Sequence, residues 1–128
     1  MQGLHLTADL HDCRCDLRWL TDASALGAHC VQAVEAAGLQ AVGQLVHGFP
    51  ATPDGPGGVT ATVLLAESHL CIHTWPEQQG VTIDVYVCNF GADHSAKARA
   101  LMAALEATFA PGRVERHALQ RGRIGAPA

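Results

Sequence analysis

The 128-residue chain lacks any concentration of basic charge. Its eight Lys and Arg residues are scattered and are outnumbered by twelve Asp and Glu, which gives a formal net charge of −4. Surfaces that bind nucleic acid or anionic membranes normally carry clustered positive charge, so neither is an expected partner. The chain also lacks an apolar run of about 18 residues and a basic segment leading into an apolar one at its start. We therefore expect a cytoplasmic protein whose partner is a small molecule.

The chain also lacks the even set of cysteines that builds a disulfide framework. It has five, including the closely spaced Cys13 and Cys15. An odd number without a Cys-x-x-Cys pair is typical of reduced thiols in a reducing compartment. For Cys13, Cys15 and Cys30 we expect structural or surface thiols in preference to a metal or redox role.

Hydrophobic residues, in contrast, make up 48% of the chain, enough for one core and a single domain over residues 1–128. Alternating or continuous apolar patterns predict six strands, and apolar stripes at helical spacing predict two helices. Three prolines and three glycines within 49–58 predict an irregular loop. The strands are expected at 4–10, 39–47, 59–66, 70–75, 81–88 and 114–119, and the helices at 22–37 and 93–109.

The order of these elements predicts an α+β fold. Strand, helix, strand, strand is followed by strand, helix, strand, so two similar halves can build one antiparallel sheet with both helices on one face. This is a two-layer sandwich. Its other face must be polar or covered by a second subunit, and we expect a homodimer.

Several polar residues are candidates for metal binding or catalysis. His69, Cys71 and His73 alternate on one strand face, but a zinc site needs a further ligand, so no metal is expected. Ser68 or Cys88 could be a hydrolase nucleophile with His73 as base, yet no Gly-x-Ser-x-Gly motif surrounds Ser68. From the residues alone, a simple strand break at Glu67, Ser68 and His69 remains open.

One block of the sequence distinguishes among these interpretations, because it resembles a known family. Residues 66–77, Ala-Glu-Ser-His-Leu-Cys-Ile-His-Thr-Trp-Pro-Glu, followed by Asp84 and Cys88, resemble the prokaryotic S-adenosylmethionine decarboxylases. Gly3-Leu4-His5-Leu6, with Asp9, Leu10 and Cys13, is similar to the opening of that family. The sharp motif is confined to residues 66–88, and a weaker similarity covers about the whole chain.

The resemblance implies a self-processing proenzyme. The Ser68 hydroxyl would attack the Glu67 carbonyl, and β-elimination followed by hydrolysis would leave a pyruvoyl group at position 68. The products would be fragments 1–67 and 68–128. The substrate amine would then form a Schiff base with this pyruvoyl group, which is made by the chain itself, so neither a metal nor pyridoxal phosphate is needed.

The resemblance also assigns roles to individual side chains. His73 would be the base or proton carrier of processing, and Thr60 would take the place of a serine that stabilises the cyclic intermediate. Cys88 would donate a proton to the carbanion. Glu77 would bind the ribose and Phe49 would stack on the adenine of S-adenosylmethionine, whose decarboxylation supplies polyamine (spermidine) synthesis.

Two alternatives to an S-adenosylmethionine decarboxylase remain open from the sequence. The 49–58 loop is several residues longer than is usual in the family, and relatives with the same chemistry decarboxylate arginine or ornithine. Such a pocket would need a carboxylate for the cationic end, for which Asp54, Glu77 or Asp84 could serve. The second alternative is a homologue that is neither processed nor catalytic.

Overall fold

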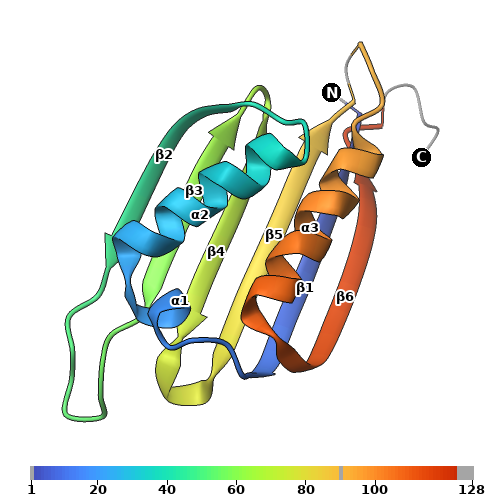
Figure 1. Cartoon of the computed structure of the whole chain (residues 1–128). Helices are drawn as coiled ribbons and strands as arrows, with labels where there is room; N and C mark the ends of the chain where they lie inside the picture. Colours follow the sequence, from blue (N-terminus) through green and yellow to red (C-terminus); the bar gives the residue numbers. More distant parts are fainter. Residues whose placement is uncertain (1, 90, 124–128) are drawn as a thin grey trace.

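The computed structural model describes residues 2–89 and 91–123. Within this part of the chain, six strands form one sheet in the order β2-β3-β4-β5-β1-β6 (Figure 1). All five neighbouring pairs are antiparallel, as the sequence predicts. The strands are β1 (Gly3–Cys13), β2 (Ala41–Gly48), β3 (Val59–Leu65), β4 (Ser68–Trp75), β5 (Gly80–Cys88) and β6 (Pro111–Arg121).

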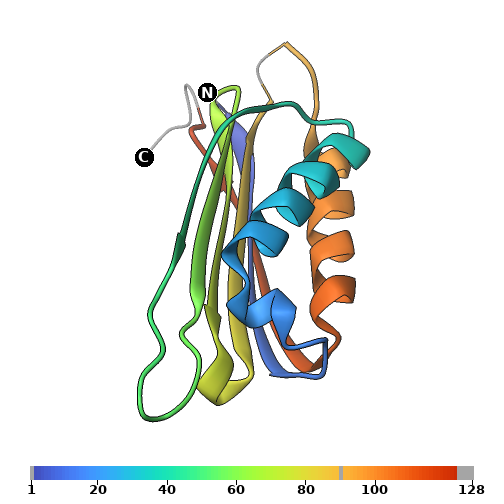
Figure 2. The ribbon, with the colours of Figure 1, turned by 60° about the vertical axis from the view of Figure 1, so that its left-hand side comes forward.

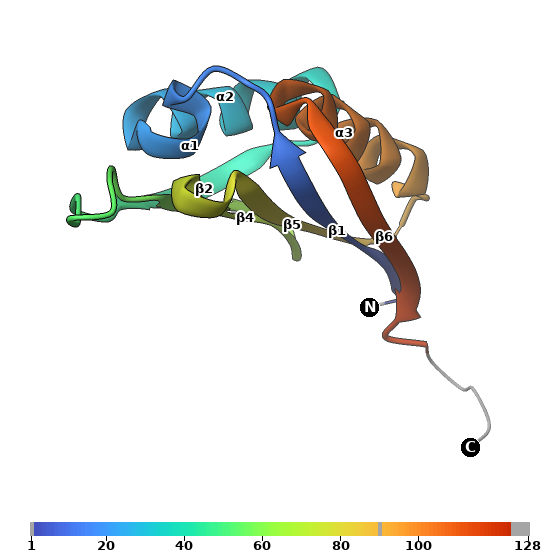
Figure 3. The same ribbon diagram turned by 90° about the horizontal axis from the view of Figure 1, so that it is seen from below.

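Both long helices cover the same face of the sheet (Figures 2 and 3). Helix α2 (Ala23–Ala36) packs on β2 and β3, and α3 (Ser95–Phe109) packs on β1 and β5. The Asp22 carboxylate accepts a hydrogen bond from the Ala25 N–H and caps α2. This arrangement confirms the α+β two-layer prediction.

Two short helical segments were not predicted. Helix α1 (Arg18–Thr21) precedes α2, and the 3-10 turn η1 (Pro76–Gln78) joins β4 to β5. Neither is long enough to produce a helical repeat in the sequence, so periodicity cannot reveal them.

Alternation of side chains along the strands separates the apolar core from a face that carries most of the polar side chains. Leu4, Leu6, Ala8 and Leu10 of β1 point toward the helices and are almost fully buried. They meet the apolar stripe of α3, which includes Leu101, Leu105 and Phe109, and the matching residues of β5, Val81, Ile83, Val85 and Val87. The intervening positions, including His5 and Asp84, lie on the face that no helix covers.

That uncovered face is not uniformly polar. It carries Leu45, Leu64, Trp75 and Leu119, of which Leu45 is 77% exposed. Large apolar side chains gathered on one open face are typical of a protein interaction surface. The described helices include none long and apolar enough to cross a membrane.

Candidate active site

The predicted cleavage position lies in a tight hairpin. Leu65 of β3 pairs with Ser68 of β4, so only Ala66 and Glu67 form the turn. Glu67 has φ 56°, in the left-handed region that a residue with a Cβ seldom adopts. This conformation costs about 1 kcal/mol or more, and it is stored in the residue before the predicted scissile bond.

Ser68 and Cys88 lie together at this end of the sheet. The Ser68 Oγ accepts a hydrogen bond from the Cys88 backbone N–H at 2.9 Å. Cys88 is 7% exposed and ends β5. A cavity of about 390 Å³ adjoins both residues and is also lined by Glu67 and His94. The structure therefore brings the predicted electrophile precursor and the predicted proton donor together.

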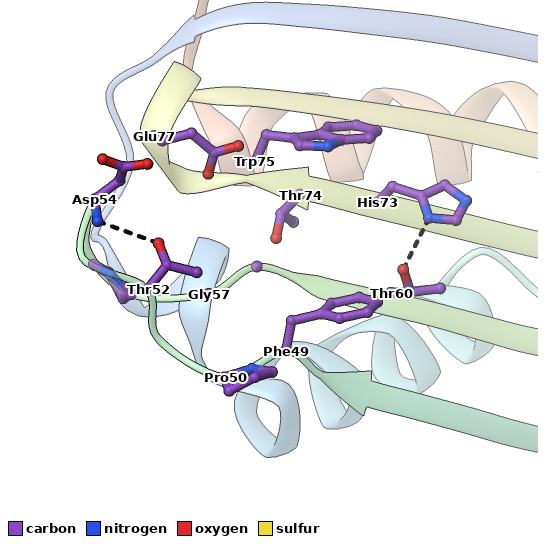
Figure 4. Close-up of a pocket in the computed structure, with 12 residues that line it drawn as sticks. Phe49, Pro50, Thr52, Asp54, Gly57, Thr60, His73, Thr74, Trp75 and Glu77 are labelled. Atoms are coloured by element: carbon purple, nitrogen blue, oxygen red, sulfur yellow. Dashed lines mark hydrogen bonds between the residues drawn. The ribbon is translucent and has the colours of Figure 1, made fainter.

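A second group lies near the opposite end of β4. Thr60 of β3 faces His73 of β4, and the Thr60 Oγ1 is 2.9 Å from the His73 Nδ1. Figure 4 shows this pair near Phe49, with Glu77 farther along the pocket beyond Trp75. All four line a pocket of about 580 Å³, to which Trp75 also contributes.

The 49–58 loop forms one wall of this pocket, and its base is held by backbone contacts. The Phe49 N–H donates to the Gly58 carbonyl at 2.9 Å. A Cβ at position 58 would come within 2.1 Å of the Thr74 carbonyl oxygen, so only glycine permits this approach. The Thr74 Oγ1 accepts from the Val59 N–H at 2.8 Å. The loop thus projects from a fixed base.

The two groups are well separated within one chain. Five residue steps of extended strand separate Ser68 from His73, and at about 3.3 Å per step this corresponds to roughly 16 Å. The sequence predicts that His73 acts on the Ser68 bond. Within a single protomer the structure places these side chains too far apart for that.

The alternating His69, Cys71 and His73 also do not converge on one point. The His69 Nε2 bonds to Asp84, the Cys71 Sγ lies 3.6 Å from the Thr62 Oγ1, and His73 bonds to Thr60. Each side chain therefore has its own partner, which argues against the zinc interpretation of this strand.

All five cysteines have free thiols. Burial raises the pKa of the Cys30 thiol to about 12 and that of Cys13 to about 11, with nearby Cys15 and Asp12 adding to the latter shift. Thiols with such raised pKa values are poor nucleophiles at neutral pH. Structural roles fit Cys13 and Cys30.

Sequence reasoning gave no role to Trp75, His5 or His94. Trp75 lies two residues after His73 and shares its pocket, so strand alternation could have identified it. His5 lies on β1 and contacts Asp84, which depends on the order of strands in the sheet. His94 reaches the Ser68 cavity from the start of α3, a placement that only the tertiary structure reveals.

Comparison with known proteins points to one family. A family model described as S-adenosylmethionine decarboxylase matches residues 4–122. A protein of Parasynechococcus marenigrum named S-adenosylmethionine decarboxylase proenzyme is 35% identical over 128 residues, which are 100% of this chain and 89% of that protein. A proenzyme of the same name from Sulfurihydrogenibium is 35% identical over 122 residues, 95% of this chain and 84% of that one. The crystal structure of the Aquifex aeolicus adenosylmethionine decarboxylase matches with a TM-score of 0.81 and 31% identity, covering 98% of this chain and 95% of that one.

Proposed function

Since the chain belongs to the S-adenosylmethionine decarboxylase family, we propose how its residues divide the work of self-processing and decarboxylation. The resemblance found in the sequence is thereby confirmed. The protein is a proenzyme of a pyruvoyl-dependent carboxy-lyase that acts on S-adenosylmethionine, and its place in polyamine synthesis is that of the family. We propose that it works in the cytoplasm, where its free thiols would stay reduced.

Ser68 is the precursor of the pyruvoyl group, and the bond between Glu67 and Ser68 is the one cut. The observation that carries this assignment is the strained turn, with Glu67 at φ 56° immediately before a serine whose Oγ is hydrogen-bonded. Cutting this turn releases the strain. The products, 1–67 and 68–128, stay associated because β3 and β4 are interior strands with neighbours on both sides.

The pyruvoyl group supplies an electrophilic keto carbon and an electron sink for decarboxylation. The Cys88 N–H holds the Ser68 Oγ, the atom that attacks the Glu67 carbonyl and departs with Glu67 at elimination, so this contact serves processing and not the pyruvoyl group itself. Cys88 itself is placed to return a proton to the substrate carbon after carbon dioxide leaves. We expect Cys88→Ala to be cleaved normally but to turn over slowly or protonate aberrantly.

The substrate's nucleoside portion occupies the pocket around Phe49 and Glu77. Phe49 is 52% exposed, and Trp75 supplies a second aromatic side chain. Stacking on adenine contributes roughly 0.5–1.5 kcal/mol beyond burial. The Glu77 carboxylate is an acceptor for the two ribose hydroxyls. Asp54 adds negative charge that suits the sulfonium.

Both groups of residues act together in a homodimer. Two copies related by a two-fold axis perpendicular to the strands, with their uncovered faces in contact, would place the Ser68 end of one sheet over the His73 end of the other. Stacked sheets lie about 10 Å apart, within reach of side chains from both. Strand alternation turns the Ser68 side chain toward the helix side, so His73 and Thr60 of the partner subunit would act on the backbone of the Glu67–Ser68 bond. The exposed Leu45 and Leu64 supply apolar contact for this interface.

Complementation between inactive chains tests this arrangement. A tagged His73→Ala chain is co-expressed with Ser68→Ala, which cannot be cut but retains His73. We expect the His73→Ala chain to be cleaved in the mixed dimer and to remain intact when expressed alone, with intact mass as the measurement. A His11→Ala chain is the control for losing a histidine elsewhere. Equal cleavage of the His73→Ala chain with and without its partner would refute the shared site.

The substrate is tested directly by carbon dioxide release. The relatives are named for S-adenosylmethionine, which favours this substrate over the arginine and ornithine considered from the loop. We expect release from S-adenosylmethionine and none above background from the two amino acids. Phe49→Ala and Glu77→Gln should raise the KM without preventing cleavage. A purified chain that stays full-length on prolonged incubation would contradict the proposed processing.

A further inference from the structure

A group of charged and aromatic side chains outside both pockets surrounds the residue that follows Ser68. The His69 Nε2 on β4 lies 2.7 Å from the Asp84 Oδ1 on β5, and the His5 Nε2 on β1 lies 3.2 Å from the same oxygen. These side chains are partly buried, with His5 18% exposed. The Arg121 NH1 on β6 is 3.2 Å from the His5 Nδ1. One carboxylate oxygen thus connects three neighbouring strands, and Arg121 extends the network to a fourth.

Arg121 fixes the positions of the protons. A guanidinium is always charged and can only donate, so the His5 Nδ1 must accept from it. The His5 proton is then on Nε2 and is donated to Asp84. An ionised carboxylate only accepts, so the His69 Nε2 also carries a proton and donates to Asp84. Every polar contact in the chain from Arg121 to His69 has one donor and one acceptor.

The same atoms are close enough to suggest a metal site, since the two Nε2 atoms and the Asp84 oxygen lie within 4.8 Å of one another. A metal requires the Nε2 lone pair of each histidine. For His5 this would move the proton to Nδ1 and direct it at the Arg121 guanidinium. The network therefore fits a set of hydrogen bonds better than a metal-binding site.

After cleavage before Ser68, this network can hold the new chain terminus in place. Before the cut, residue 68 is held from both sides by the hairpin. Afterwards it is a chain terminus, and termini fray unless something holds them. Its position then depends on His69, whose backbone nitrogen carries the carbonyl of residue 68. His69 pairs with Leu64 and Tyr86 along the backbone, and its side chain bonds to Asp84.

We propose that Asp84, supported by His5 and Arg121, anchors the His69 side chain and so positions the reactive terminus produced by cleavage. This inference rests on the proposed cut before Ser68. His69 and Asp84 are positioning residues, since they act through the backbone of residue 69. A displacement of about 1 Å at a reacting centre can cost as much as 100-fold in rate. Loss of the anchor should therefore lower kcat by about 10- to 100-fold and change KM little.

The test compares Asp84→Asn with Asp9→Asn, the same chemical change on the same sheet face outside the network. Cleavage is followed by intact mass, and kcat and KM are measured for S-adenosylmethionine. Backbone hydrogen exchange reports fraying in the peptide that begins at residue 68. We expect Asp84→Asn to be cleaved, to exchange faster at the start of β4 only, and to lose kcat. Asp9→Asn should match the wild type in all three.

A second pair of variants separates anchoring from general destabilisation. His69→Gln keeps an N–H donor for Asp84 and should stay within about threefold of the wild-type kcat, whereas His69→Leu should fall by about 10- to 100-fold. Equal kcat in the Gln and Leu variants would overturn the proposal. So would an Asp84→Asn chain that folds but stays uncleaved, because the intact hairpin needs no anchor. If the wild type itself is not cut, the proposed function fails instead.

Discussion

The Thr74 hydroxyl is expected to contribute more to the stability of the fold than its size suggests. Thr74 is 5% exposed and lies where the β3–β4 ladder has ended, since the last pair joins Thr60 and His73. Its Oγ1 donates to the Leu20 carbonyl of α1 at 2.7 Å and accepts from the Val59 N–H at 2.8 Å. One hydroxyl therefore ties α1 and the base of the 49–58 loop to β4.

Thr74→Val removes this hydroxyl at nearly constant volume. The Val59 N–H and the Leu20 carbonyl would be left without partners in residues that are 1% and 2% exposed. Each buried unsatisfied group costs about 1–3 kcal/mol, so we expect the free energy of unfolding to fall by about 2–6 kcal/mol. Thr74→Ser keeps both hydrogen bonds and loses one methyl group, which costs about 0.8 kcal/mol.

Urea unfolding measures the difference. Both substitutions are made in a Ser68→Ala host, expected to remain one uncut chain, and are compared at equal protein concentration because the proposed dimer makes stability concentration-dependent. The Val variant should unfold at clearly lower urea than the Ser variant. Equal midpoints and slopes would refute the reasoning that Thr74 acts through its two hydrogen bonds.

Three further results are expected. Glu67→Gly removes the conformational cost of φ 56° at this position, which is about 1 kcal/mol. If that strain is released at the transition state, the variant should be cleaved roughly fivefold more slowly than the wild type. Intact mass measures the cleavage rate, and an unchanged rate would contradict this prediction. Burial, with a smaller contribution from Arg18, lowers the pKa of His29 below its ordinary value. The unfolded chain therefore binds this proton more readily, and the stability due to neutral His29 is complete above about pH 6.5 and is lost as pH falls further. Between pH 7.5 and 5.5 the wild type should lose more unfolding free energy than His29→Asn, and equal losses would refute the assignment. Iodoacetamide at pH 8 should leave Cys30 unmodified in the folded protein and alkylate it in urea, because burial raises its pKa to about 12; rapid labelling when folded would contradict its burial.

The strands and long helices could be predicted because one face of each meets the same core. Residues 81–87 alternate strictly, and this alternation places Asp84 on the uncovered face as expected, whereas Cys88 at the end of the strand is buried like its neighbour Val87. Strand β6 is longer than predicted, since it begins at Pro111 and the Pro-Gly pair suggested a turn. A proline can occupy the first residue of a strand, where its missing N–H leaves no ladder position empty.

The sequence names candidate site residues, but it does not give the geometry that they adopt. The motif identifies Ser68, His73 and Cys88, and strand spacing alone sets Ser68 and His73 roughly 16 Å apart. Spacing within one chain cannot show that a second copy brings the two ends together. Neither does composition predict the φ of Glu67, since glutamate has no preference for the left-handed region and the turn length imposes it.

The division between the two sheet faces explains how a chain can be cut inside its own sheet and keep its fold. Burial of the helix-facing residues of β3 and β4, including Val63 and Leu70, does not depend on the bond between these strands. The opposite face carries the network of His5, His69 and Asp84, which would be covered in the proposed dimer. Removing water from around these hydrogen bonds strengthens them, because the local dielectric falls. Dimerisation would thus tighten the anchor at the same time as it completes the site, and the reactive terminus would be held most firmly when a partner is present to use it.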